Sequence, residues 1–418
     1  MIADRTRVRR AVVSASMQTA FPRSVHWRDH DVAQGDAGLA LACAQFDRCC
    51  PGKGWDVVGH EYLSCAVGSV QGRRLPAGLF NGLAGLAFVT GQLSRGGARY
   101  VRLARTIEGE LDAASVALAR SVDAGSAGLA ASEFDAICGL AGIAAHLLAR
   151  SAGAGSTGSD AARDAVLGAL VRLLRGSGRE VPRWATPPEF LLHAEEVQRY
   201  PRGNLNCGLA HGVPGPLAML SLALAAGVRV DGLHDAVREA ARWLAHHRVD
   251  DRWGVNWPVA VTLPDDGTGD DAPSRAAWCY GSPGLARALW LAGVALEDDG
   301  IRALAIEAMA GVYARPVAAR QIDSPTFCHG VAGLLQVTLR FRQDTGDAMF
   351  DDAATALVDQ LLDAFEPDDS LLGFRSVESG GGRVEAPGLL DGAPGVALVL
   401  LAAATPVEPT WDRLFLLA

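Results

Sequence analysis

The feature that most constrains the fold of this chain is a Gly-x-x-Gly motif that recurs seven times in the same context. An apolar run with helical character follows the motif, and successive motifs lie 47 to 73 residues apart. The first glycines of the seven motifs are Gly35, Gly82, Gly139, Gly212, Gly281, Gly330 and Gly392. Repeats of this length are typical of architectures in which each unit buries its apolar face against its neighbours.

More polar segments with helical periodicity lie between the apolar runs. In residues 160–175, Val166, Leu170 and Leu173 fall on one helical face, while Arg163 falls elsewhere. The same pattern occurs in residues 100–120, 231–248, 298–313 and 347–365. We therefore predict an all-α fold in which seven apolar inner helices form a ring wrapped by seven amphipathic outer helices. Glycines would let the inner helices converge at one end, where the loops line a cavity.

Two intervals are longer than a helix pair needs. Residues 176–203 contain four prolines, and residues 250–274 contain a strand-like run at 259–263 followed by an acidic turn at 264–271. Long excursions on a repeat scaffold often carry its binding face. We expect both to lie near the active-site face, the second as a small strand-bearing excursion; the alternative is that they are ordinary surface loops.

Composition and charge exclude several classes of protein. The net charge of −9 gives no electrostatic reason to expect a nucleic-acid partner. The basic N-terminus has no apolar segment behind it, and the longest apolar stretch, residues 396–404, is too short to cross a bilayer. We expect a cytoplasmic protein whose eight cysteines are reduced or bind a metal.

Two of the repeated motifs carry metal-ligand side chains. Cys279 precedes the motif at Gly281, and the adjacent pair Cys328 and His329 precedes the motif at Gly330. Catalytic zinc sites usually have three protein ligands of this kind and keep a fourth position open. The alternative is that the cysteines are buried and act as small hydrophobic side chains. We predict one Zn²⁺ per chain, held by these three residues.

Three spaced motifs, taken in order, resemble the lanthipeptide (lantibiotic) synthetase C family, the LanC-like cyclases, and most of all its stand-alone class I members. The motifs span residues 208–215, 278–281 and 328–333, and residues 200–206 and 411–415 add to the likeness. The resemblance covers most of the chain and is strongest in residues 200–395. It implies a single α/α-toroid domain over residues 1–418, with zinc near one end of the central cavity.

The resemblance also implies an activity and partners. In this family, a cysteine thiol of a dehydrated precursor peptide adds to dehydroalanine or dehydrobutyrine and closes a lanthionine or methyllanthionine thioether ring. The implied partners are that peptide and, in addition, a lanthipeptide dehydratase and a membrane exporter. The implied location is cytoplasmic or peripheral to a membrane-associated biosynthetic complex.

Cys279, Cys328 and His329 match the zinc ligands of the family position by position. Two thiolates cancel the formal charge of Zn²⁺ and weaken it as a Lewis acid, which suits poorly the production of hydroxide. Such a site suits the capture of an incoming thiol, whose pKa of about 8.5 it would lower while leaving the thiolate nucleophilic.

Four further residues match catalytic positions of the family. His211 is the predicted proton donor to the α-carbon, because its ordinary pKa lies near neutrality. Asp135 would orient or tune His211 or help to move protons itself, although an aspartate at this place can also be a helix cap. Arg275 would stabilise the enolate, and Tyr280 would donate a hydrogen bond or simply pack.

Two other classes of function compete with the cyclase. One is a non-catalytic, zinc-containing protein of the same fold that binds a peptide or thiol; the presence of His211 and Asp135 argues against it. The other is a glycosidase on a helical toroid, which needs paired carboxylates. Asp135 and Asp391 are the motif-borne carboxylates, and the sequence does not pair them. A glycosidase would also leave the two cysteines and the histidine unexplained.

Overall fold

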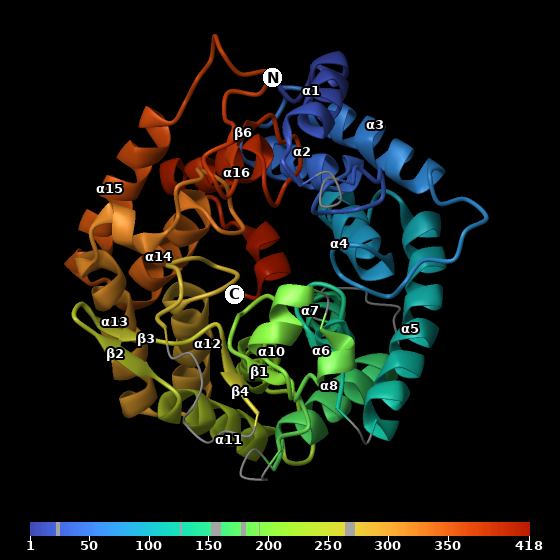
Figure 1. The fold of residues 1–418 in the computed structure, drawn as a ribbon. Helices are drawn as coiled ribbons and strands as arrows, with labels where there is room; N and C mark the ends of the chain where they lie inside the picture. The colour runs from blue at the N-terminus through green and yellow to red at the C-terminus, as the bar shows by residue number, and fades with distance from the viewer. Residues whose placement is uncertain (22–25, 126–127, 152–159, 177–180, 192, 264–271) are drawn as a thin grey trace. The chain divides into compact units, whose positions relative to one another are not determined.

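The computed structural model describes residues 1–21, 26–125, 128–151, 160–176, 181–191, 193–263 and 272–418 (Figure 1). These residues fall into two compact units. The first unit consists of Met1–Pro76, Phe80–Ile107 and Gln321–Asp412, and the second unit of Ala77–Leu79, Glu108–Arg320 and Arg413–Ala418. Each unit therefore combines segments that are far apart in the sequence.

The first unit is built mainly from four helices that begin at a glycine motif, which we call repeat helices. They are α2 (Asp36–Cys49), α4 (Leu83–Leu93), α14 (Val331–Thr345) and α16 (Ala393–Ala404). They pack in the order α14, α16, α2, α4. The amphipathic helices α15 (Ala348–Asp363) and α3 (Trp55–Gly68) cover this row, and we call such helices covering helices. Because α16 packs against α2, segments from near the two ends of the chain lie side by side in this unit.

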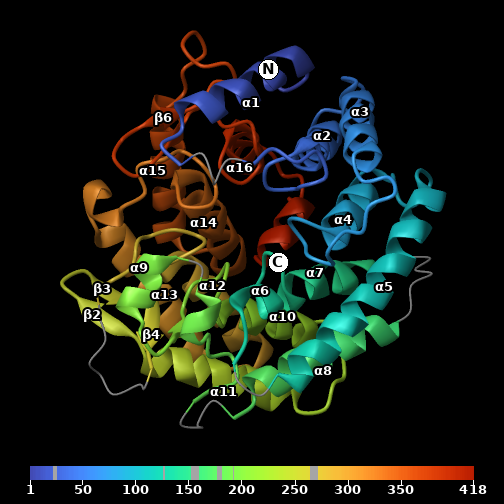
Figure 2. The ribbon, with the colours of Figure 1, turned by 45° about the vertical axis from the view of Figure 1, so that its right-hand side comes forward.

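The remaining elements of the first unit lie near its chain ends. They are α1 (Arg5–Gln18) and the antiparallel pair β5 (Ser376–Val377) and β6 (Arg383–Val384). Figure 2 shows α1 beside β6, and the two elements are in contact. Helix α5 (Val101–Ala124) begins in the first unit and continues in the second.

The second unit has the same plan. Its repeat helices are α7 (Leu140–Ser151), α10 (Pro214–Ala225) and α12 (Ser282–Ala295), and α10 packs between the other two (Figure 1). The covering helices are α8 (Asp160–Leu174), α11 (Leu233–His246) and α13 (Asp299–Ala314). Short helices α6 (Ala131–Phe134) and α9 (Ala194–Arg199) lie in the connections, together with the 3-10 turns Pro188–Phe190 and Val317–Arg320.

Burial confirms the predicted alternation of apolar and amphipathic helices. In α14 every residue from Val331 to Phe341 is buried, whereas α15 buries only Phe350, Ala354, Leu357 and Leu361. A helix that is apolar all round must be enclosed, and a helix with one apolar stripe must lie at the surface of its unit. The repeat helices therefore form the core of each unit, and the covering helices face the solvent.

The seven glycine motifs mark the starts of the seven repeat helices of the described residues. Six of these helices begin directly after the first glycine, and α10 begins two residues after Gly212. A Cβ at Gly281, whose φ is +109°, would lie 1.5 Å from the carbonyl oxygen of Arg275. A Cβ at Gly284 would lie 2.1 Å from the carbonyl of Trp278 and 3.0 Å from the Cβ of Leu209. The first glycine of the motif therefore leaves space for the backbone of its own loop. The second leaves space for that loop and for a side chain of the neighbouring motif.

The predicted strand-bearing excursion is confirmed. Strand β4 (Ala260–Thr262) pairs antiparallel with β1 (Asn204–Asn206), and Leu205 lies opposite Val261. A second antiparallel pair joins β2 (Val249–Asp251) to β3 (Gly254–Asn256). The predicted acidic turn at 264–271 lies outside the described residues. Within the described ranges, every helix is too short or too polar to span a membrane.

Candidate active site

His211 and Asp135 form a hydrogen-bonded pair in the second unit. The Nδ1 atom of His211 lies 2.7 Å from Oδ2 of Asp135, although the two residues are 76 positions apart in the sequence. The Asp135 side chain is 1% exposed and that of His211 is 42% exposed. The carboxylate therefore holds one ring nitrogen from inside the protein and leaves Nε2 on the opposite side of the ring. The structure places these two predicted residues together.

Asp135 is held in place by the start of helix α7. Its Oδ1 atom accepts hydrogen bonds from the backbone N–H groups of Ile137, Cys138 and Gly139, at 3.1, 2.7 and 2.8 Å. One oxygen of Asp135 contacts the turn before α7 and the other contacts His211, so the geometry is compatible with both interpretations, helix cap and histidine partner. The three N–H donors fix the carboxylate in the orientation that places Oδ2 against His211.

Tyr280 lies in the same unit, near His211. The centres of the two rings are 6.4 Å apart, and the Tyr280 hydroxyl accepts a hydrogen bond of 3.1 Å from Nδ2 of Asn206. Oδ1 of Asn206 in turn accepts from the backbone N–H of Gly208 at 2.8 Å. Burial raises the pKa of the Tyr280 hydroxyl, so it remains a neutral phenol near pH 7. A Cβ at Gly208 would lie 2.6 Å from the Tyr280 ring, which explains the glycine there.

Cys279 lies on a loop that is docked against the His211 loop. The carbonyl oxygen of Cys279 accepts a hydrogen bond of 3.3 Å from the backbone N–H of Ala210, and Cys279 is buried. Its neighbour Trp278 donates its indole N–H to the carbonyl of Phe415 at 3.0 Å, which anchors the loop in the core. Arg275, on the same loop, is half-buried. The second unit thus brings one predicted metal ligand and all four predicted catalytic residues onto neighbouring loops.

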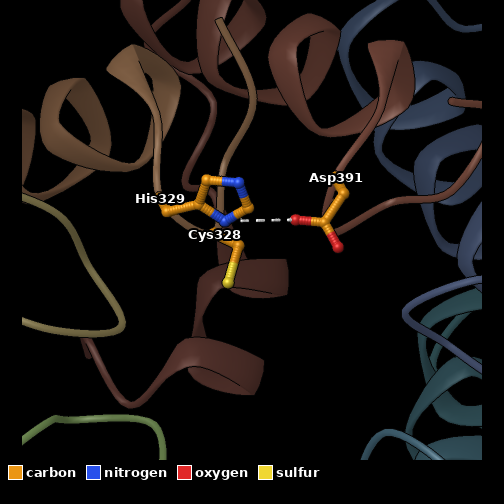
Figure 3. Close-up of side chains that lie close together, drawn as sticks. All are labelled: Cys328, His329 and Asp391. Atoms are coloured by element: carbon orange, nitrogen blue, oxygen red, sulfur yellow. Dashed lines mark ion pairs between the residues drawn. The ribbon is translucent and has the colours of Figure 1, made fainter. Parts of the chain in front are cut away.

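The other two predicted ligands lie in the first unit, beside a carboxylate. The donor atoms of Cys328, His329 and Asp391 all lie within 4.8 Å of one another. Figure 3 shows the Asp391 carboxylate facing the imidazole of His329, and Nδ1 of His329 is 3.7 Å from Oδ1 of Asp391. The backbone N–H of Cys328 donates to the carbonyl of Leu390 at 3.0 Å, which ties the two loops together.

The chemistry of this cluster fits a zinc ion. Thiolate, imidazole and carboxylate are all ligands that Zn²⁺ accepts. Oδ1 of Asp391 is buried and has no hydrogen-bond partner among the described residues. Burial raises the pKa of Asp391, while His329 and a hydrogen bond from Gln34 act in the opposite direction. Cys279 belongs to the second unit, so its membership of one site with Cys328 and His329 stays a prediction.

The sequence interpretation missed two residues of these clusters, Asn206 and Asp391. One signal could have drawn attention to Asp391. The position directly before the first motif glycine holds His211, Tyr280, His329 and Asp391 in the last four repeats. Three of those four are predicted site residues, so the fourth belonged in the same group. For Asn206, the only comparable signal is its place six residues before Gly212.

Comparisons with known proteins agree with the fold and the motifs. Residues 26–416 match the family described as "Lanthionine synthetase C-like protein". The "Nisin biosynthesis protein NisC" of Lactococcus lactis subsp. lactis is 26% identical over 223 residues, which are 52% of this chain and 51% of that protein, so the aligned part is about half of each. A solved structure titled "Nisin cyclase" matches with a TM-score of 0.79 and 21% identity, covering 99% of this chain and 97% of the other.

Each comparison supports a different conclusion. The structural match shows the fold, and the predicted α/α-toroid is thereby confirmed. The partial sequence match carries no conclusion about activity. The family match extends over almost the whole chain and includes every predicted site residue. This chain therefore belongs to the lanthionine synthetase C-like protein family.

Proposed function

We propose that this protein is a zinc-dependent lanthipeptide cyclase. It would add cysteine thiols of a dehydrated precursor peptide to dehydroalanine or dehydrobutyrine and so form lanthionine or methyllanthionine rings. The observation that carries the proposal is the pair of His211 and Asp135, 2.7 Å apart, on a loop docked against that of Cys279. A non-catalytic binding protein would not need a buried carboxylate to hold an exposed imidazole.

The metal would be held by Cys279, Cys328 and His329. When bound, it would lower the pKa of the substrate thiol and keep the resulting thiolate nucleophilic. The rest of the reaction falls to side chains of the protein. The new C–S bond forms at the β-carbon, and the electrons of the C=C bond move toward the α-carbon and its carbonyl. The resulting enolate must then receive one proton.

His211 is the group that supplies this proton. Its Nδ1–H donates to Asp135, so the protonated ring presents an N–H at Nε2 toward the substrate side. Asp135 would orient the ring and stabilise the imidazolium, because three N–H groups hold its other oxygen in place. Over the full cycle the thiol proton is lost and the α-carbon proton is gained, so the mass of the peptide stays constant.

Tyr280 and Arg275 would stabilise the charge that develops on the enolate. The neutral phenol of Tyr280 can donate one hydrogen bond while its oxygen accepts from Asn206. Arg275 lies on the same loop and supplies a positive charge. A glycosidase is not favoured, because Asp135 is occupied by His211 and helix α7 while Asp391 faces His329.

The proposal includes the wider biological setting. The substrate would be a dehydrated precursor peptide, with a dehydratase and a membrane exporter as further partners, and the location would be cytoplasmic or peripheral to a membrane complex. We also propose that residues 1–418 act as one cyclase domain. The excursions at 176–203 and 250–274 would lie near its active-site face.

The test is a thiol count on a model substrate. A synthetic peptide with one dehydroalanine and one free cysteine is incubated with the zinc-loaded protein, and free thiol and mass are measured together. A cyclase removes one thiol equivalent per peptide at constant mass. Binding of the peptide with no loss of thiol would instead identify a non-catalytic relative, and a mass gain of one water would identify a hydrolase.

A further inference from the structure

Asp391 stands out because nothing in the proposed reaction uses it. It directly precedes the motif glycine at the start of α16, as His329 does at the start of α14. Its carboxylate shares a small region with the thiol of Cys328 and the imidazole of His329, all within 4.8 Å. The first unit therefore offers three metal-ligand atoms by itself, one more than the sequence predicted for it.

The spacing of these atoms favours a shared cation over a direct hydrogen bond. Nδ1 of His329 and Oδ1 of Asp391 are 3.7 Å apart, whereas N–H···O hydrogen bonds span about 2.7–3.2 Å. Two ligands at about 2.1 Å from one tetrahedral zinc lie roughly 3.4 Å from each other. The observed distance is closer to that second value.

The surroundings of Oδ1 lead to the same conclusion. This oxygen is buried and accepts no hydrogen bond from the described residues. A buried carboxylate oxygen without a partner is costly, and such atoms normally find a donor, a proton or a metal. Asp135 provides the contrast within this chain, because its Oδ1 receives three backbone N–H groups in the loop before α7.

We propose that Asp391 is an additional ligand of the metal bound by Cys328 and His329, and that it holds the fourth coordination position until the substrate thiolate replaces it. This inference rests on the proposed function. A carboxylate is a harder ligand than a thiolate, so soft zinc sites with two sulfurs would exchange it readily for a third sulfur. The exchange would form one metal–sulfur bond and break one metal–oxygen bond, with Asp391 released as a free carboxylate.

The experiment compares three variants with the wild-type protein. Asp391→Asn removes the ligand charge at almost constant shape, and Asp391→Ala is a second variant of the same position. Asp323→Asn is the matched control, since Asp323 is an exposed carboxylate on the loop that leads to Cys328. Zinc dissociation constants are measured by competition with a chromophoric chelator. Cobalt(II) is then loaded in place of zinc, and its visible absorption is recorded.

We expect both Asp391 variants to bind zinc about 10–100-fold more weakly and to change the cobalt d–d bands, while Asp323→Asn matches the wild type. A short cysteine peptide should bind the cobalt form of Asp391→Asn more tightly than the wild-type cobalt form, because the competing ligand is gone. The metal-free variants should unfold at or above the wild-type temperature, which verifies that they fold.

Wild-type zinc affinity and an unchanged cobalt spectrum in both Asp391 variants would overturn the inference. So would a weaker zinc affinity with unchanged cobalt bands, which would make Asp391 a positioning residue for His329. Cys328→Ala separates this failure from that of the proposed function. If Cys328→Ala loses zinc while Asp391→Asn keeps it, only the role of Asp391 is wrong.

Discussion

The two units place a carboxylate beside a histidine in opposite ways, and the Asp135 side chain is 1% exposed whereas that of Asp391 is 28% exposed. In the second unit, Oδ2 of Asp135 meets His211 at hydrogen-bond distance, and Oδ1 accepts from three backbone N–H groups. In the first unit, Asp391 lies 3.7 Å from His329 and keeps one buried oxygen without a donor. The first arrangement is made by protein atoms alone, and the second would be completed by the cation proposed above.

This difference separates the two tasks of the proposed reaction. A proton donor must be held in one orientation before the substrate arrives, so its supporting hydrogen bonds belong to the folded protein. A metal site must leave its ligands unsatisfied until the ion binds, since ligands that are already hydrogen-bonded compete with the metal. The second unit is therefore expected to tolerate metal removal, and the first unit is expected to depend on it.

The largest effect should follow the loss of a thiolate in the first unit. Cys328→Ala is expected to reduce zinc from about one ion per chain to nearly none and to abolish cyclisation. Zinc is measured by atomic emission on dialysed protein, and cyclisation by the thiol count. Cys50→Ala, at an exposed free cysteine, is the control. A Cys328→Ala protein with a full zinc content would show that this cluster is not the metal site.

The next largest effect should follow the loss of the proton donor in the second unit. His211→Asn is expected to slow cyclisation about 10²–10⁴-fold and to leave the zinc content unchanged. This variant therefore separates cyclisation rate from zinc content, whereas Cys328→Ala is expected to change both. Turnover at the wild-type rate would end the assignment of His211 as the acid.

Asp135→Asn tests whether the carboxylate acts through His211. The amide oxygen can still accept from the N–H groups of the turn before α7, but the amide nitrogen would donate to Nδ1 and force the wrong tautomer of the ring. We expect a loss of roughly 10²-fold or more in kcat with little change in KM. The double variant Asp135→Asn/His211→Asn should have a kcat only slightly lower than that of His211→Asn alone. Additive losses in the double variant would show that Asp135 acts independently.

Asn206→Ala should have a smaller effect, confined to the second unit. It removes the donor to the Tyr280 hydroxyl and the acceptor for Gly208, so we expect a loss of about 1 kcal/mol in stability and a cyclisation rate several-fold lower. Tyr280→Phe provides the comparison in a double-mutant cycle. If Asn206 acts through that hydroxyl, the effects of the two substitutions on rate will not add. Fully additive effects on rate would mean that Asn206 stabilises its own loop and does not act through the Tyr280 hydroxyl.

Much of the fold could be predicted because the glycine motif and the helix start are both local in sequence. Helix α14 begins directly after Gly330, and its neighbour α15 has the expected single apolar stripe. The reason for the glycines was only partly foreseen. At Gly281 the space is needed by the carbonyl of Arg275 in the same loop, and a residue pattern does not show the path of a loop backbone.

Site residues could be predicted from the sequence only where they occupy the same position relative to a motif glycine. His211 and Tyr280 precede their motif glycines, and the structure places their rings close together. The hydrogen bond between Asn206 and Tyr280 joins residues 74 positions apart, and Asp391 meets His329 from a different repeat. Such pairings depend on which repeat helices become neighbours and how their loops face each other, and one sequence does not record that.

The smallest expected effect concerns Asp36, a carboxylate of the first unit that we do not assign to the metal site. Asp36, the first residue of α2, is fully buried, pairs with Arg9 at 2.9 Å and keeps Oδ1 without a partner in the described residues. Burial raises its pKa to about 6. The folded protein therefore holds this proton more tightly than the unfolded chain, whose group has its ordinary pKa of 3.8. The stabilising contribution is present in full at low pH and is lost as the pH rises through about 6.

Asp36→Asn removes this titration and fixes the group in its neutral form. The variant should gain stability relative to the wild type between pH 5 and pH 8, by about 2–4 °C in melting temperature, because only the wild type must bury a charge at pH 8. Comparison of the two proteins at each pH cancels the pH dependence of zinc binding, which both share. If the difference in melting temperature between the two proteins stays constant across this range, the ion pair with Arg9 is sufficient to compensate the buried charge of Asp36. A buried carboxylate oxygen without a hydrogen-bond donor would then also be weaker evidence for a cation at Asp391.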